Sequence, residues 1–212
     1  MSNRFWAVLA IVAVLFVGVA VLSKDDKKEV SNATVSSHIY GKSDKGITLT
    51  EYGDFQCPYC GQFYPTVKQV AEKYKDTVKF QFSHYPLQQV HQNAFAAARA
   101  SEAADKQGKF WEMYDLLYSQ QAAWSNSNSA QSVFTGYAKQ LGLNTDQFKT
   151  DYSSKATNDT INADMQAFDK LKLRVATPTF LLNGKQIKPD NSVESFSKIL
   201  DEALAAKADK KE

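Results

Sequence analysis

The stretch Cys57-Pro58-Tyr59-Cys60 carries the only two cysteines of a 212-residue chain. The preceding run Ile47–Tyr52 follows the period of a strand, and the apolar residues after the stretch recur at helical spacing, which predicts a helix over 58–75. Two cysteines separated by two residues can close a small disulfide ring and exchange thiols with a partner. No further cysteine is present to build a disulfide framework, and so we interpret the pair as redox chemistry.

Two structural roles compete with that interpretation. A structural zinc site needs four ligands, and only His38, His84 and His91 could supplement the cysteines. These histidines are scattered along the sequence, so we expect no metal, and nothing in the motif calls for a bound cofactor. A lone structural disulfide is the second alternative, but a ring closed over two residues removes little entropy from the unfolded chain.

The start of the predicted helix would make the two thiols unequal. With Cys57 near the cap and Pro58 in the first turn, the Cys57 sulfur faces unpaired backbone N–H groups and the positive end of the helix dipole. Both favour the thiolate and lower the pKa of Cys57. Cys60 lies one turn further in and is more enclosed, so we expect it to be the resolving thiol.

The rest of the pattern predicts an α/β fold. Val78–Phe82 alternates as a second strand, the chain is nearly all helical from about 88 to 173, and Asn183-Gly184 is the turn of a late hairpin. The strands thus lie at both ends, with the helices between them. We expect one domain over 46–206, interrupted by this helical insertion and followed by a charged tail, 207–212.

The beginning of the sequence indicates a membrane segment. An unbroken apolar run extends from Phe5 to Leu22 and can cross a bilayer. We favour a retained anchor for 1–22, although Gly18-Val19-Ala20 could serve as the cleavage site of a signal peptide. Residues 23–45 are polar and predict a tether. Either way, the domain is expected to be exported, where disulfides persist.

The composition argues against some partners. Hydrophobic residues make up 43% of the chain, charged residues 23%, and the formal net charge is +2. This is neither a nucleic-acid-binding polycation nor a disordered acidic chain, so we expect no nucleic-acid partner.

The order of these elements resembles the thioredoxin superfamily: a strand, Cys-Pro-Tyr-Cys at a helix start, a second strand, and Thr177-Pro178 before a hairpin. Asp54–Cys60, Gln107–Met113 and the helical insertion further resemble the DsbA-like thiol-disulfide oxidoreductases of the bacterial cell envelope. The resemblance covers about residues 46–206. It implies a thioredoxin-like fold and the activity of a protein dithiol-disulfide oxidoreductase.

The resemblance also implies a substrate site beside the cysteines. Pro178 matches the family's cis-proline, which lies against the cysteines and leaves a backbone edge free to pair with a substrate strand. Thr177 precedes it, and Pro58 and Tyr59 complete the expected substrate-binding set. Tyr59 stands where strongly oxidising members often carry histidine, so we expect a milder oxidant.

Glu51 matches the family's buried acid beneath the resolving cysteine. Alternation puts it on the same face as Ile47 and Leu49, where an apolar setting should raise its pKa. From there it could relay the proton of Cys60. The alternative is an edge glutamate that reaches solvent.

Two other groups of residues have plainer interpretations. Phe110, Trp111, Tyr114 and Tyr118 have helical spacing and are expected in the core of the insertion. His84 and His91 flank a Tyr-Pro-Leu segment and are expected to be solvated or locally bonded.

Taken together, the sequence predicts an oxidase that introduces disulfides into exported proteins. Its partners would be reduced exported proteins and a membrane redox protein that reoxidises it. We expect it in the bacterial cell envelope, anchored in the cytoplasmic membrane with the catalytic domain outside. The alternatives are an envelope reductase or isomerase, and a non-catalytic peptide-binding module or chaperone that presents the Pro178 edge.

Overall fold

The computed structural model describes residues 34–208. The predicted membrane segment at 1–22 and the end of the charged tail lie outside this range. Within it, no helix combines the length and the apolar character needed to cross a bilayer.

A five-stranded sheet with the order β1-β3-β2-β4-β5 is the centre of the domain. β2 and β3 are parallel, and the other neighbouring strands are antiparallel. The turn between β4 and β5 is formed by Asn183 and Gly184, both at positive φ (49° and 81°), as the Asn-Gly signal predicts. The strands are β1 (His38–Tyr40), β2 (Thr48–Gly53), β3 (Lys79–His84), β4 (Thr179–Leu182) and β5 (Lys185–Ile187).

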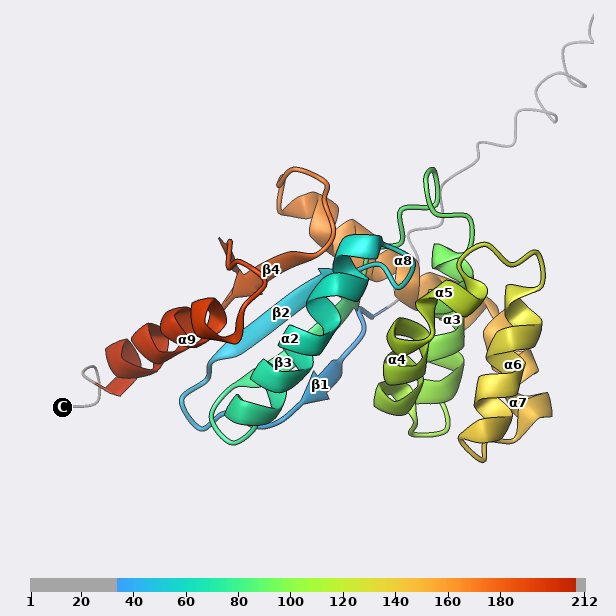
Figure 1. The fold of residues 1–212 in the computed structure, drawn as a ribbon, viewed down its shortest axis with the longest axis horizontal. Coiled ribbons are helices and arrows are strands. Elements are labelled where there is room, and N and C mark those ends of the chain that lie inside the picture. Colours follow the sequence, from blue (N-terminus) through green and yellow to red (C-terminus); the bar gives the residue numbers. More distant parts are fainter. Residues whose placement is uncertain (1–33, 209–212) are drawn as a thin grey trace, which may run out of the picture. The chain divides into compact units, whose positions relative to one another are not determined.

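The helices follow the predicted order, with the insertion between β3 and β4. α2 connects the parallel strands β2 and β3, and α9 follows the hairpin. Figure 1 shows α3, α4, α6 and α7 side by side at one end of the domain, with α2 crossing the sheet. The helices are α2 (Pro58–Tyr74), α3 (Ala94–Asp105), α4 (Phe110–Ser119), α5 (Gln121–Trp124), α6 (Ala130–Gln140), α7 (Thr145–Ser153), α8 (Lys155–Lys170) and α9 (Val193–Ala208).

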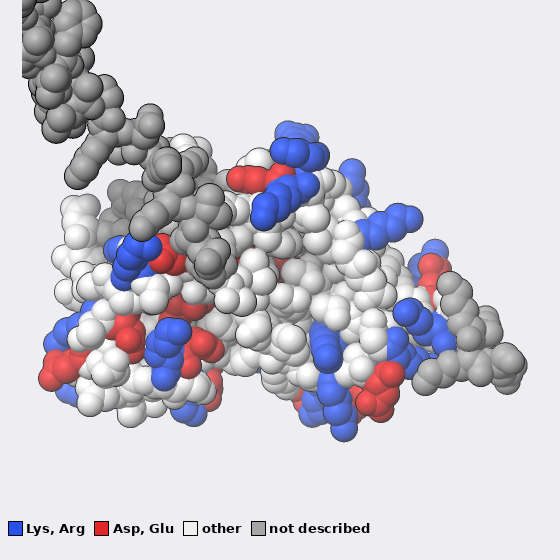
Figure 2. Space-filling model, turned by 180° about the vertical axis from the view of Figure 1, so that it is seen from behind, with Lys and Arg blue, Asp and Glu red and all other residues white. Residues whose placement is uncertain are grey.

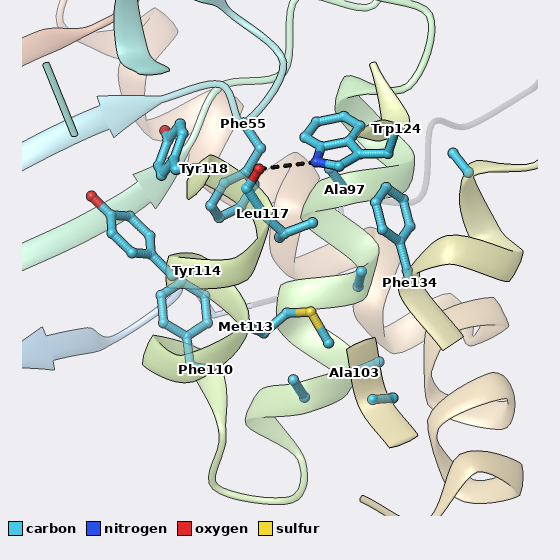
Figure 3. Packing of buried hydrophobic residues seen from close by; sticks show 14 of the residues in the cluster. Phe55, Ala97, Ala103, Phe110, Met113, Tyr114, Leu117, Tyr118, Trp124 and Phe134 are labelled. Carbon is cyan, nitrogen blue, oxygen red and sulfur yellow. Dashed lines mark hydrogen bonds between the residues drawn. The ribbon is translucent and has the colours of Figure 1, made fainter. Parts of the chain in front are cut away.

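The buried residues form two large clusters, and the cysteines belong to the one built by the insertion. The first cluster contains Cys57, Cys60, the aromatic rings of α4 and residues of the other insertion helices. Within it, the Trp124 indole donates a hydrogen bond to the Leu117 carbonyl (2.9 Å; Figure 3). The second packs α2 and α9 against the sheet. Phe110, Tyr114 and Tyr118 lie in the first cluster, as predicted, whereas Trp111 is only partly buried and packs against both clusters. The cysteine motif is therefore positioned where the insertion meets the sheet and α2.

Residues 23–33 of the predicted polar tether lie outside the described range, and over 34–45 the structure differs from the prediction, because His38–Tyr40 form β1 against β3. The contacts that hold this short strand are largely polar and distant in sequence. The Ser36 amide and hydroxyl donate to the Asp164 carboxylate (2.8 and 2.5 Å), and His38 stacks on the Phe110 ring at 3.5 Å. The domain therefore begins earlier than the expected residue 46. The sequence did not predict this strand because no local apolar pattern marks it.

Charged side chains are mixed in sign on the face seen in Figure 2. Lysines and arginines lie among aspartates and glutamates at the lower edges of this view, and uncharged residues fill much of its centre. Because charges of opposite sign lie close together, their fields largely offset one another at a distance.

Candidate active site

Cys57 lies at the N-terminus of α2, as the motif predicts. It is the N-cap residue, with extended backbone angles (φ −63°, ψ 123°), and Pro58 opens the helix, where its missing N–H costs no hydrogen bond. A hydrogen bond from the Cys60 thiol is the largest cause that lowers the pKa of Cys57 to about 6, against the opposing effect of burial. Thr177 and the backbone N–H groups of Cys60 and Tyr59 lower it further. Cys57 is therefore the thiol that ionises near neutral pH.

Cys60 has the opposite environment. It is fully buried, and burial is the first cause that raises its pKa well above the usual range, followed by the hydrogen bond to Cys57 and the charge of Glu51. Both cysteines are free thiols in this structure. The pair thus combines a sulfur of lowered pKa at the start of α2 with a fully buried sulfur of raised pKa.

The segment before β4 lies against Cys57. The Thr177–Pro178 peptide bond is cis, as the resemblance implies. The Thr177 carbonyl oxygen lies 3.4 Å from Cys57 Sγ and accepts the hydrogen bond of that thiol. The fold therefore brings Thr177 next to Cys57 over a long stretch of sequence.

Glu51 is buried on β2, so the alternative of a glutamate that reaches solvent is wrong. Only 1% of the residue is exposed, and its register partners on the neighbouring strands are Phe82 and Phe180. Burial is the main cause that raises the pKa of Glu51 to about 8, the charge of Cys57 raises it too, and the Tyr114 hydroxyl lowers it. Glu51 therefore keeps its proton at neutral pH.

Polar residues that the sequence did not single out hold the motif against the insertion. The Gln121 amide of α5 donates to the carbonyls of Phe55 (2.7 Å) and Cys57 (3.0 Å). The Gln56 side chain accepts from the Asn93 amide (2.6 Å). A lone glutamine has no sequence pattern of its own, so only the fold reveals this role.

Asp54 fixes the loop that follows β3. Its buried carboxylate accepts hydrogen bonds from the amides of Gln56 (2.7 Å) and Leu87 (2.9 Å) and contacts Nδ1 of His91 at 2.6 Å. His91 is locally bonded, as expected. Asp54 thus links Gln56, which precedes Cys57, to the loop that contains Leu87 and His91.

His84 is neither solvated nor bonded to a residue near it in sequence, so the prediction for it is wrong. It is fully buried, and its Nε2 lies 2.8 Å from the same Glu102 oxygen that Nε2 of His38 contacts at 2.5 Å. The two histidines meet because β1 pairs with β3, with His38 opposite Phe82. Their separation in sequence concealed this cluster.

The His38–His84–Glu102 cluster is the group of described residues with donor atoms suited to a metal. These atoms all lie within 4.8 Å of one another, and imidazole and carboxylate are donors that zinc accepts. Here both nitrogens are at hydrogen-bonding distance from one oxygen, the geometry of a buried ion pair. Burial opposes ionisation of Glu102, but hydrogen bonds from His38 and His84 outweigh it and lower the pKa of Glu102 to about 2.

The chain belongs to the thioredoxin family, since residues 33–202 match the family model described as Thioredoxin. Among curated proteins it is similar to the Na(+)/H(+) antiporter NhaA 1 of Salinispora arenicola, with 35% identity over 168 residues that cover 79% of this chain and 25% of the relative. NhaA 1 of Mycolicibacterium gilvum is 38% identical over 154 residues, which cover 70% and 24%. The chain thus spans about a quarter of the length of these relatives.

Solved structures show that the fold is DsbA-like. The alpha-DsbA1 protein of Wolbachia pipientis has a TM-score of 0.72 at 20% identity, covering 84% of this chain and 95% of that one. Oxidised BdbD from Bacillus subtilis has a TM-score of 0.67 at 24% identity, with coverages of 82% and 100%. MdbA, a thiol-disulfide oxidoreductase from Corynebacterium diphtheriae, has a TM-score of 0.62 at 17% identity, with coverages of 81% and 98%.

Proposed function

We propose that this domain is a thiol-disulfide oxidoreductase that introduces disulfides into exported proteins through Cys57 and Cys60. The observation that carries the proposal is the unequal pair: the pKa of Cys57 is lowered to about 6, whereas that of buried Cys60 is raised. A stabilised thiolate at Cys57 favours the reduced pair, which makes the disulfide form an oxidant. The DsbA-like fold supports the same activity.

The proposed reaction begins with the pair as a disulfide. A substrate thiolate attacks Cys57 Sγ, the bond to Cys60 breaks, and Cys60 leaves with the electron pair as a thiolate. Neutral Glu51 gives this buried thiolate a proton. A second substrate thiolate then attacks the substrate sulfur of the mixed disulfide, and Cys57 leaves as a stabilised thiolate. Two electrons have passed from the substrate dithiol to the enzyme pair.

Substrate would bind as an extended segment beside Cys57. The proposed contacts are Pro58, Tyr59, Thr177 and Pro178. Tyr59 is 65% exposed and offers apolar surface directly at the motif. Contact at this surface would align a substrate thiolate with a Cys57 sulfur that is itself only slightly exposed.

The cellular setting is part of the same proposal. The oxidase would act in the bacterial cell envelope, held by the apolar segment Phe5–Leu22, with the catalytic domain outside the cytoplasmic membrane. Because each turnover leaves the pair reduced, a membrane redox partner must remove two electrons.

The test is disulfide transfer by the full chain purified in detergent. The oxidised protein should convert a reduced two-cysteine protein to its disulfide form. In the reverse direction, the Cys57 thiolate of Cys60→Ala should attack the disulfide form of the same substrate, releasing one substrate thiolate, and the mixed disulfide should accumulate because the resolving thiol is missing. If Cys57→Ala transfers disulfides as well as the wild type, the proposal is wrong. A reduction potential near about −270 mV, rather than toward about −120 mV, would instead assign a reductase.

A further inference from the structure

Two tyrosine hydroxyls of helix α4 in the insertion point toward β2, the strand that carries Glu51. Tyr114 and Tyr118 are 3% and 4% exposed, and Figure 3 shows both hydroxyls pointing from α4 to the side of the sheet. A Cβ placed on Gly53 would lie 3.1 Å from the Tyr118 hydroxyl. Gly53 is two residues beyond Glu51 on β2 and shares its face of the sheet. The hydroxyl of Tyr118 therefore lies over the part of β2 that carries the buried carboxyl.

The two rings are fixed by aromatic neighbours. Tyr114 and Tyr118 pack edge to face with centroids 4.9 Å apart. Tyr114 also contacts Phe82 (5.2 Å), and Tyr118 contacts Phe55 (5.0 Å). Rings enclosed in this way cannot swing their hydroxyls out to solvent without opening the core.

Three polar atoms in this region have no hydrogen-bond partner among the described residues: Oε2 of Glu51 and the hydroxyls of Tyr114 and Tyr118. Tyr114 approaches Glu51 closely enough to lower the pKa of its carboxyl, yet its hydroxyl makes no well-formed hydrogen bond. Buried polar groups are nearly always paired, so three unpaired atoms around one carboxyl require an explanation. Phenylalanine at either tyrosine position would fill the same core without the cost of a buried, unpaired hydroxyl.

We infer that Tyr114 and Tyr118 are positioning residues for disulfide exchange, whose hydroxyls hold the Glu51 carboxylate formed when Glu51 protonates the Cys60 thiolate. This inference rests on the proposed function. At rest Glu51 is neutral and makes little use of the two donors. After the bond between Cys57 and Cys60 breaks, the negative charge moves from the Cys60 sulfur to the Glu51 carboxylate, and the two O–H groups then donate to it.

Donors that are already oriented act most strongly on the charged state. Hydrogen bonds to an ionised group are about twice as strong as those between neutral groups, and more so where water is excluded. Since these donors are held in place before the charge forms, they lower the barrier without stabilising the resting state. The helical insertion would thus supply the groups that let a buried acid give up its proton.

The experiment compares Tyr114→Phe, Tyr118→Phe and the double variant with the wild-type full chain in detergent. Tyr152→Phe is the matched control, because Tyr152 is a buried tyrosine of α7 outside this group. Three quantities are measured: the titration of the Glu51 carboxyl by carbon-13 NMR, the single-turnover rate at which a dithiol peptide reduces the Cys57–Cys60 disulfide as a function of pH, and the urea midpoint.

In the double variant we expect the Glu51 pKa to rise by about one unit and the single-turnover rate at neutral pH to fall about tenfold. The urea midpoint should not fall, because only unpaired hydroxyls are removed, and Tyr152→Phe should match the wild type in rate and Glu51 titration. A Glu51 titration unchanged in the double variant overturns the inference, as does a rate loss equal at every pH with a lower urea midpoint. If the wild type transfers no disulfide at all, the proposed function fails, and the Glu51 titration still decides whether the tyrosines act on the carboxyl.

Discussion

Removal of the Cys60 thiol should make Cys57 a weaker acid. The Cys60 hydrogen bond is the largest cause of a pKa that lies near 6 instead of 9.0. A hydrogen bond to a charged group contributes about 1.5–3 kcal/mol, which corresponds to about one to two pKa units. We therefore expect Cys60→Ala to titrate between about 7 and 8, which lowers the thiolate fraction at pH 7 from about nine tenths to half or less.

The assay is the thiolate absorbance of the reduced protein as a function of pH, checked by the rate of alkylation of Cys57. Cys60→Ser is the matched control, since its hydroxyl is of similar size and still donates a hydrogen bond. It should titrate close to the wild type. If Cys60→Ala and the wild type give the same curve, the backbone N–H groups at the start of α2 account for the whole effect, and the reasoning from the Cys60 donor is refuted.

Two further predictions concern stability. Gly53→Ala places a methyl group 2.4 Å from the Phe82 ring and should lower the free energy of unfolding by about 1–3 kcal/mol. Gly136→Ala is the control, because its methyl group meets nothing within 4 Å and should be neutral or stabilising in the helix. If urea denaturation shows that the two variants lose similar free energies of unfolding, the prediction is wrong. Glu102→Gln should lower the free energy of unfolding by about 3 kcal/mol at the pH where its effect is greatest. Asp105 and Glu102 outweigh burial and raise the pKa of His38 from 6.5 to about 9, so the stability from that pairing is complete below pH 6.5 and lost as pH rises through 9. The pKa of Glu102 is lowered from 4.5 to about 2, so its share is complete above pH 4.5 and lost as pH falls through 2. The difference between wild type and variant should therefore be greatest between pH 4.5 and 6.5, and a difference independent of pH would show that the ion pair is not its source.

The features that the sequence predicted correctly are those recorded in neighbouring residues. The period of Ile47–Tyr52 places Glu51 on an apolar face, and the structure confirms its burial. The proline after Cys57 marks the helix start, and Asn183-Gly184 marks the turn between β4 and β5. In each case the chain itself restricts the backbone or alternates the side chains, so a short window is enough.

The features that the sequence missed depend on polar contacts between distant segments. β1 is only three residues long, so no local period marks the strand. Just before it, Ser36 donates its backbone hydrogen bond to the Asp164 carboxylate, which lies on α8. His84 was expected to be solvated or locally bonded, which is the default for a histidine. Its burial follows from Glu102, which the insertion brings against the sheet.

For the α4 tyrosines, the sequence predicts where the ring lies but not where the hydroxyl points. Helical spacing correctly places the rings of Tyr114 and Tyr118 in the core, because the position of a ring on a helix face follows from local geometry. The Tyr118 hydroxyl needs the room that the missing side chain of Gly53 leaves over β2, and the Tyr114 ring is held by the rings of Phe82 and Tyr118. The insertion therefore supplies polar groups to the site as well as apolar packing. It places the Tyr114 hydroxyl near Glu51, where that hydroxyl lowers a pKa that burial raises, and it places the Gln121 amide on the Cys57 carbonyl.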